Sequence, residues 1–239
     1  MRFPIRIVVA LCLIASLELV AAEENSKADF SAGLPKEYAG KYLLAANTLS
    51  PDKTIGVIYP KAGICDQGSE KDCKNFLVQL KPFNVLATLK TDWPHFENKN
   101  HGGIDAHWAK NNAAVVVTLE SKWGPGDIFL YELKAGQLAR STDLIPKIRA
   151  LLEPDFRKAM GVRAKKDQFS FILESSPDKP TIGLKGSTVR INVDATTNPK
   201  RTPGEKAWDG RVEAIWDIPQ ARFTSQKVTR LFAGIRKDE

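Results

Sequence analysis

The sequence predicts a mainly β protein, in which antiparallel strands form an open meander and one helix lies near residues 143–160. Two observations lead to this prediction. Short runs of β-branched and aromatic residues, each bounded by turn-forming residues, recur through the first part of the chain. After Arg140, the spacing of apolar residues changes to that of an amphipathic helix, and alternating apolar and polar residues follow it.

The composition is that of a folded protein. Of the 239 residues, 43% are hydrophobic and 26% are charged, which excludes a disordered chain and a protein with many membrane spans. The first 22 residues are predicted to be a signal peptide, because Arg2 and Arg6 precede an apolar run of 11 residues and small residues end at Ala22. Such a run is too short to span a bilayer. We therefore expect cleavage near Ala22 and a secreted or periplasmic protein without a transmembrane segment.

Two cysteines, Cys65 and Cys73, remain after this cleavage. In an exported protein, a cysteine pair that flanks a short polar loop indicates a disulfide bond. The alternative is a redox-active or metal-binding pair, but such sites typically place two residues between their cysteines. The spacing therefore favours a structural disulfide that closes the loop.

The region 23–140 contains an internal repeat. Residues 76–81 and 129–134 have similar sequences at an offset of 53 positions, and a turn sequence precedes each unit. The two units lie at about 50–89 and 109–140, and each is interpreted as antiparallel strands joined by turns. The strands predicted within them are 54–59, 75–81, 85–89, 113–119 and 128–133.

The first unit opens with Ser50-Pro51-Asp52-Lys53, and this phrase resembles the start of a strand in WD40-type and TolB-type β-propellers. The resemblance implies two blade-like units. Two blades cannot close a ring, since propellers have at least about four, so an open propeller-like or sandwich arrangement is expected. The chain also resembles a class of uncharacterised exported bacterial proteins, through residues 50–52, 99–103 and 208–211. This second resemblance implies only an exported, β-rich protein.

Residues 141–239 are predicted to contain the helix, followed by an antiparallel β region. The helix is indicated by apolar residues at helical spacing: Leu144, Ile145, Ile148, Leu151, Leu152 and Phe156. Pro154 is expected to break or kink the helix, and Gly161 can end it. Strands are expected at 169–173, 189–193 and 211–218, with a further strand after a turn at Pro219. Whether this part and residues 23–140 form one domain or two stays open.

All three histidines, His95, His101 and His107, fall in one short segment that also contains Asp105. If the segment is extended, their even spacing places them on one side of the chain, where they could bind a divalent metal ion. The segment matches no established zinc motif, however, and Gly102-Gly103 interrupts a regular strand. The favoured alternative is structural, with a turn at His101 and with His107 packed beside Trp108.

Two further groups are candidate ligand-binding residues. Trp93, Trp108 and Trp123 recur at intervals of 15 residues. Exposed tryptophans in a secreted β protein can stack on sugars or peptides, whereas buried ones fill the core. The second group is basic and consists of Arg157, Lys158, Arg163, Lys165 and Lys166. Such a cluster attracts an anionic polysaccharide, a lipid headgroup or an acidic protein, unless it is only the solvated end of a helix.

The net charge is unevenly divided along the chain. The 35 basic and 28 acidic residues give +7, which becomes +6 without the first 22 residues. Residues 23–140 hold 14 basic and 14 acidic side chains, so the whole excess lies in residues 141–239. We expect no nucleic-acid partner for an exported protein. The excess of basic residues in 141–239 therefore favours another anionic partner, outside the cell interior.

Catalytic motifs are absent from the sequence, which has no Gly-x-Ser-x-Gly elbow, no phosphate-binding loop and no dinucleotide-binding fingerprint. Three functions stay open. The favoured one is a binding or interaction protein, whose partner is an anionic polysaccharide, an envelope component or another protein. The second is a metal-assisted hydrolase built on the histidine segment, the one hypothesis that needs a cofactor. The third is a structural component of the cell envelope.

Overall fold

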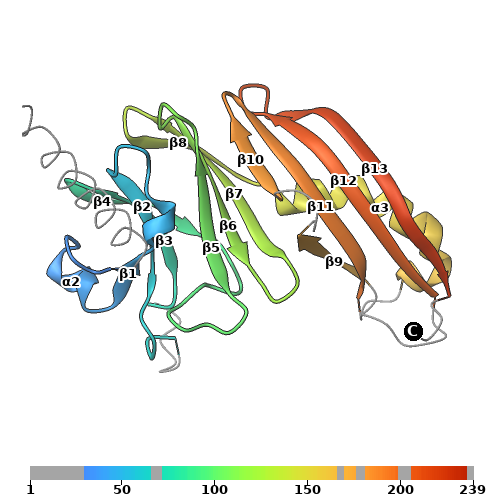
Figure 1. The fold of residues 1–239 in the computed structure, drawn as a ribbon, viewed down its shortest axis with the longest axis horizontal. Helices are drawn as coiled ribbons and strands as arrows, with labels where there is room; N and C mark the ends of the chain where they lie inside the picture. The colour runs from blue at the N-terminus through green and yellow to red at the C-terminus, as the bar shows by residue number, and fades with distance from the viewer. Residues whose placement is uncertain (1–29, 66–71, 166–169, 176–180, 199–205, 236–239) are drawn as a thin grey trace, which may run out of the picture.

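The computed structural model of the protein describes residues 30–65, 72–165, 170–175, 181–198 and 206–235 (Figure 1). Within these residues the chain forms three antiparallel sheets and one long helix. The sheets do not close into a barrel in this part of the chain. The prediction of a mainly β, antiparallel and open fold with one helix is therefore confirmed.

Apart from β9 (Ser170–Ser175), the strands of each sheet lie in chain order. The first sheet contains β1 (Tyr42–Leu44), β2 (Ile55–Pro60), β3 (Asn75–Leu80) and β4 (Phe83–Leu89). The second contains β5 (Gly103–Trp108), β6 (Ala114–Glu120), β7 (Pro125–Lys134) and β8 (Gln137–Asp143). The third contains β10 (Ile182–Lys185), β11 (Thr188–Asn198), β12 (Lys206–Asp217) and β13 (Arg222–Ile235), and β9 pairs with the far half of β11. The short helices are α2 (Lys36–Ala39), η1 (Ala46–Thr48) and η2 (Gly161–Lys165).

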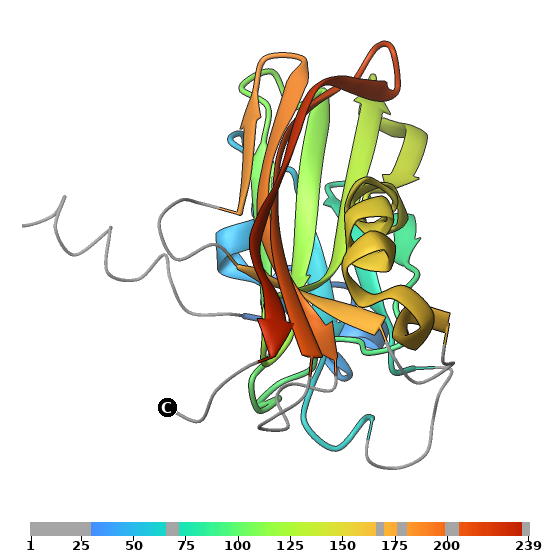
Figure 2. The same cartoon turned by 90° about the vertical axis from the view of Figure 1, so that its right-hand side faces the viewer.

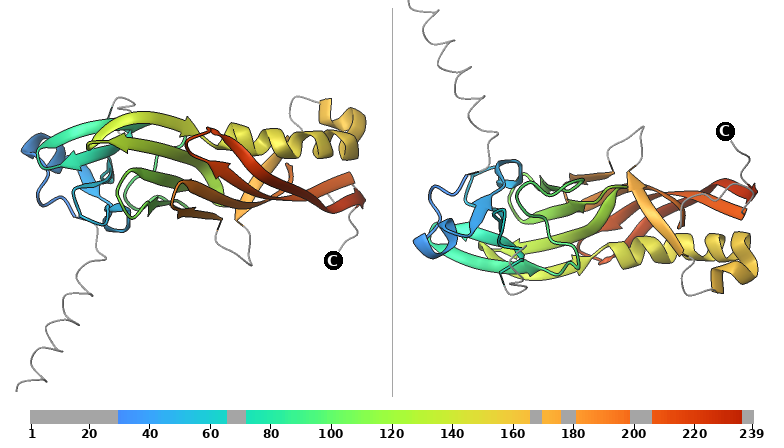
Figure 3. Two further views of the ribbon diagram at one scale, coloured as in Figure 1. Left: turned by 90° about the horizontal axis from the view of Figure 1, so that it is seen from above. Right: turned by 90° about the horizontal axis from the view of Figure 1, so that it is seen from below.

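The second sheet lies between the other two, and its inner strands β6 and β7 are buried on both faces (Figures 1 and 3). Val115 and Val117 of β6 pack into a core shared with the first sheet. Ala114 and Val116 pack into another core, shared with the helix and the third sheet. A strand with two buried faces needs apolar residues at successive positions, which explains why β6 lacks the usual alternation.

The long helix, α3 (Ile145–Met160), packs against the third sheet (Figure 2). Ile148, Leu152 and Phe156 recur four residues apart and are buried, so one face of the helix meets the core. The ring of Phe156 contacts those of Phe171 and Trp208, with centroids 5.1 and 5.4 Å away. This aromatic cluster joins α3 to β9 and β12.

The ends of α3 agree with the sequence, but its interior does not. Asp143 Oδ1 accepts a hydrogen bond from the Ile145 N–H at 3.0 Å, and Gly161, with φ 60°, ends the helix. Of the two effects expected of Pro154, a break does not occur, because the helix continues through it to Met160. Pro154 points outward, and the buried side chains before and after it hold both neighbouring turns against the sheet, which offsets the missing hydrogen bond.

The disulfide prediction is confirmed, since Cys65 and Cys73 are bonded with an S–S distance of 2.09 Å. The predicted signal peptide lies outside the described residues. No helix in the described part of the chain combines the length and the apolar character that crossing a bilayer requires.

Candidate functional site

The connection from the first sheet to the second is a long loop, residues 90–102, between β4 and β5. It carries two of the three histidines and Trp93. Because it leaves one sheet and enters another, its backbone groups do not continue a strand ladder and need other partners. The side chains that supply these partners determine how the loop presents Trp93.

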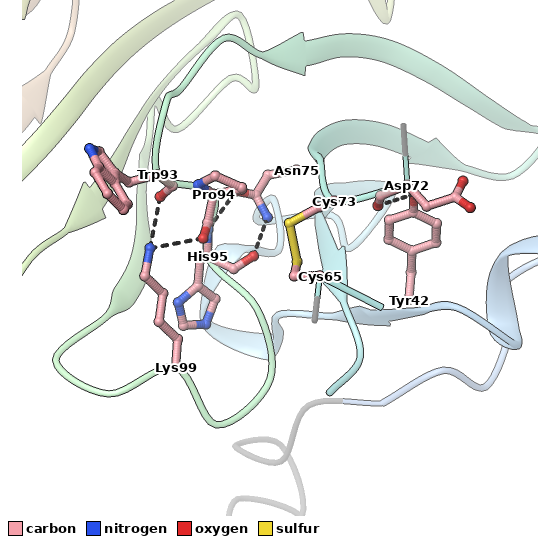
Figure 4. Close-up of a disulfide and its surroundings, with 9 residues drawn as sticks. All are labelled: Tyr42, Cys65, Asp72, Cys73, Asn75, Trp93, Pro94, His95 and Lys99. Carbon is pink, nitrogen blue, oxygen red and sulfur yellow. Dashed lines mark hydrogen bonds between the residues drawn. A yellow bond between two sulfur atoms is a disulfide. The ribbon is translucent and has the colours of Figure 1, made fainter. Parts of the chain in front are cut away.

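Asn75 and Lys99 hold the start of this loop (Figure 4). The buried Asn75 on β3 donates from Nδ2 to the His95 carbonyl at 2.7 Å and accepts from the His95 N–H at 2.9 Å. Lys99 Nζ donates to the carbonyls of Trp93 and Pro94, both at 2.9 Å. The backbone on both sides of Pro94 is thus fixed, and the Trp93 ring lies on the side away from the disulfide.

Further contacts fix the middle of the loop. The His95 ring packs against Tyr59 of β2, with ring centroids 4.8 Å apart. The Glu97 carboxylate accepts a hydrogen bond from the Ala62 N–H at 2.8 Å, and the Glu97 N–H donates to the Pro60 carbonyl at 2.9 Å. His101 adopts a positive φ of 56°, so the chain turns there before β5 begins. The loop therefore has a defined shape.

A cleft of about 420 Å³ lies between this loop and the turn that joins β6 to β7. We call it the Trp93 cleft. Its lining residues on the loop are Asp92, Trp93, Lys99, Asn100 and His101. Those on the other wall are Leu119, Glu120, Ser121, Lys122, Gly126 and Asp127.

Three charged groups of the Trp93 cleft, Asp127, Glu120 and Lys99, have displaced pKa values. Burial raises the pKa of Asp127, and a hydrogen bond from Thr91 and the charge of Lys99 counteract part of this effect. Burial, followed by the charge of Asp105, raises the pKa of Glu120. Burial lowers the pKa of Lys99, with an opposing contribution from Asp127. Partly dehydrated carboxylates and an ammonium group in one concave site are characteristic of functional sites.

A hydrogen-bonded chain connects the backbone of Trp93 to one of these carboxylates. The backbone N–H of Trp93 donates to Thr91 Oγ1 at 3.0 Å, and the Thr91 hydroxyl donates to Asp127. Trp93 itself is 79% exposed. The cleft thus offers an apolar ring face, carboxylate acceptors and ammonium donors side by side.

The other two predicted tryptophans lie differently. Trp123 is 48% exposed and lies outside the lining, with the Lys122 ammonium 4.7 Å from its ring centroid. Trp108 packs against the core between the first two sheets, and its Nε1 donates to the Thr48 carbonyl at 2.8 Å. The equal spacing in sequence therefore does not produce one aromatic surface.

The four predicted metal ligands do not converge. His95 packs on Tyr59, His101 is exposed at the Trp93 cleft, and His107 lies 3.4 Å from Asp105 along β5. Among the described residues, no three His, Cys, Asp or Glu side chains form a group that could hold a metal ion. The histidine segment instead forms part of the loop 90–102 and of strand β5.

The predicted basic cluster is described only in part. Arg157 and Lys158 are exposed in the last turn of α3, and Arg157 Nε is 2.7 Å from Glu153 Oε1. The structure describes neither the side chains of Arg163 and Lys165 nor any part of Lys166. The binding role of this cluster stays a prediction.

Glu120 and Asp127 were not predicted as site residues. They flank a turn whose sequence carries no recognisable motif, and only the packing of loop 90–102 brings them to Trp93. No protein-family model matches this chain, and a search of curated proteins finds no match to it. The site must therefore be interpreted from its own geometry.

Proposed function

We propose that the protein is a secreted or periplasmic binding protein that holds a neutral saccharide in the Trp93 cleft. The observation that carries the proposal is the position of Trp93, an indole 79% exposed at the rim of a cleft that contains two half-buried carboxylates. A large exposed aromatic ring is costly to leave in water, whereas the apolar face of a sugar ring can cover it.

The polar groups favour a neutral ligand. Glu120 and Asp127 accept hydrogen bonds, whereas Lys99 and Lys122 donate them. An anionic ligand would be repelled by the carboxylates, and a cationic one by the ammonium groups. Sugar hydroxyls both donate and accept, so a neutral saccharide can satisfy the two kinds of group at once.

The size and rigidity of the site agree with this ligand class. A cleft of about 420 Å³ lies within the range typical of small-molecule sites. The loop that carries Trp93 is held by Asn75 and Lys99 before any ligand arrives, so little conformational entropy is lost on binding.

The proposed compartment rests on two features. The predicted signal peptide would direct export, and the disulfide between Cys65 and Cys73 is of a kind that persists in oxidising surroundings. The relationship to propeller blades and to exported bacterial proteins stays a prediction and does not enter the choice of ligand.

A glycan array first tests whether the protein binds a saccharide. Titration calorimetry and tryptophan fluorescence then measure the affinity for maltose, cellobiose and N,N′-diacetylchitobiose. At least one neutral saccharide is expected to bind, and Trp93→Ala is expected to weaken its affinity by about tenfold or more. Trp123→Ala is the matched control, because its ring is also exposed but lies outside the lining.

Two results would overturn the proposal. One is a glycan array on which the folded wild-type protein binds no saccharide. The other is a saccharide whose affinity is the same for wild type, Trp93→Ala and Asp127→Asn, because its site would then lie elsewhere.

A further inference from the structure

A second, larger cleft lies where hairpin turns of the second and third sheets meet. It has a volume of about 820 Å³. Four turns contribute to it, namely those joining β5 to β6, β7 to β8, β10 to β11 and β12 to β13. The β6–β7 turn of the Trp93 cleft lies at the opposite end of the second sheet, so the two clefts are separate sites (Figure 1).

The walls of this second cleft are mainly apolar. Leu133 and Ala114 belong to the second sheet, whereas Leu184, Ile218 and Pro219 come from the third. Such walls supply few hydrogen bonds, so they suit a hydrocarbon chain better than a hydroxyl-rich ligand.

The rim of the cleft is positively charged. Lys110, Lys134 and Lys185 line it, each from a different turn, and all three are exposed. None of them forms an ion pair with a described residue. We call this site the three-lysine cleft.

The carboxylate in its lining is already neutralised. Glu132 accepts hydrogen bonds from Arg140, from Nε to Oε1 at 2.5 Å and from Nη2 to Oε2 at 2.9 Å. The three lysines therefore leave a net positive rim above apolar walls, which complements an anionic head on an apolar body.

Arg140 also fixes the width of the cleft. Its Nη2 donates to the Ile218 carbonyl, so a residue of β8 is bonded directly to the turn that follows β12. The Ile218 N–H donates in turn to the Ser187 carbonyl at 3.0 Å. These bonds connect the second sheet to two turns of the third, so the cleft is formed without a ligand.

We propose that the three-lysine cleft binds a single-chain carboxylate amphiphile, such as a free fatty acid anion. The acyl chain lies between the apolar walls, and the carboxylate lies among Lys110, Lys134 and Lys185. Both the charge and the apolar lining select this occupant: a neutral alcohol lacks the head charge, and a small anion lacks the chain.

Calorimetric titration with dodecanoate, dodecanol and acetate tests the proposal. Dodecanoate is expected to bind, with dodecanol about tenfold or more weaker and acetate without measurable affinity. The variant Lys110→Ala/Lys134→Ala/Lys185→Ala is expected to weaken dodecanoate binding by about tenfold or more. Lys36→Ala/Lys74→Ala/Lys90→Ala removes the same charge from exposed sites elsewhere and is the matched control.

Ala139→Trp provides an independent variant, because Ala139 is exposed and lines the cleft, so a large ring fills the site without disturbing the core. It is expected to abolish dodecanoate binding and to leave saccharide binding at the Trp93 cleft unchanged. Dodecanoate bound equally by wild type and Ala139→Trp would overturn the proposal. Binding to phosphatidylglycerol vesicles that is lost in the triple lysine variant but kept in Ala139→Trp would also overturn it. The lysines would then recognise only headgroups at a membrane surface.

Discussion

Trp208 and Asp155 share a hydrogen bond that joins the third sheet to the helix covering it. Trp208 Nε1 donates to Asp155 Oδ2 at 2.8 Å, and the Trp208 side chain is fully buried. Arg230 of β13 donates to the same carboxylate, from Nε at 2.9 Å and from Nη2 at 2.5 Å. One carboxylate therefore binds α3 to both β12 and β13.

Replacement of Asp155 should weaken this connection. We expect Asp155→Ala to lower the free energy of unfolding by about 1–2 kcal/mol, because the buried indole N–H then lacks its acceptor. Urea denaturation at neutral pH measures this change. Glu37→Ala, on the exposed helix α2, is the control, and equal stability of the two variants would contradict the prediction.

The Asp155 carboxylate should make the free energy of unfolding depend on pH. The Arg230 hydrogen bond, helped by Trp208, lowers the pKa of Asp155 in the folded state. Its contribution is therefore present above the unfolded pKa of about 3.9 and is lost as the pH falls through the folded value. Urea denaturation between neutral and strongly acidic pH should show a steeper loss of stability for wild type than for Asp155→Asn. Parallel curves would contradict this.

Gly210 is required by the packing of Trp208. A Cβ atom at this position would overlap the Trp208 ring at Cζ2 and Cη2. We expect Gly210→Ala to lower the free energy of unfolding by about 1–3 kcal/mol, because the buried indole has to move. Gly183→Ala on β10 is the matched control, since no atom lies within 4 Å of its new methyl group. Similar melting temperatures for the two variants would refute the prediction.

The sequence predicts most strands because their signals are local. The predicted strands 54–59, 75–81 and 128–133 overlap β2, β3 and β7. The short strand β10, Ile182–Lys185, contains Gly183 and shows no clear alternation, so it was not predicted. It forms because the neighbouring β11 pairs with it. Such a strand depends on its partner more than on its own residues.

The site was harder to predict than the fold. Trp93 was a candidate because of its regular spacing from Trp108 and Trp123, but the carboxylates beside it, Glu120 and Asp127, belong to strands of the second sheet. The pattern of three histidines suggested a shared site, whereas β5 and the preceding loop direct them to different surroundings. Regular spacing in sequence predicts proximity only inside one regular element, and here the chain turns at His101.

Removal of the disulfide should affect stability more than the site. We expect Cys65→Ser/Cys73→Ser to lower the free energy of unfolding by about 2 kcal/mol, since the unfolded chain gains freedom when a short loop is opened. Saccharide binding should persist, because Asn75, which holds the Trp93 loop, lies on β3 and keeps its hydrogen bonds to His95. Urea denaturation with and without dithiothreitol measures the change. An equal effect of dithiothreitol on wild type and on the double variant would contradict it.

Asp127 should oppose folding while it supports binding. Burial raises its pKa, with further contributions from Asp143 and Asp92, so the charged form is less favourable in the folded protein than in the unfolded chain. Without ligand, the free energy of unfolding should therefore rise as the pH falls through the raised pKa of Asp127. Asp127→Asn removes the buried charge and can still accept the Thr91 hydrogen bond, so this variant should be more stable than wild type at neutral pH.

The affinity for a saccharide should change in the opposite direction. A charged Asp127 accepts two hydrogen bonds from sugar hydroxyls, whereas the amide accepts fewer and the protonated acid must donate one. Asp127→Asn should therefore bind more weakly by about tenfold, and wild-type affinity should fall with acid at a pH above the ordinary range of an aspartate. Calorimetry across this pH range, with denaturation of both proteins, measures the two effects. An Asp127→Asn protein that is less stable and binds unchanged would mean that the carboxylate supports the fold and not the ligand.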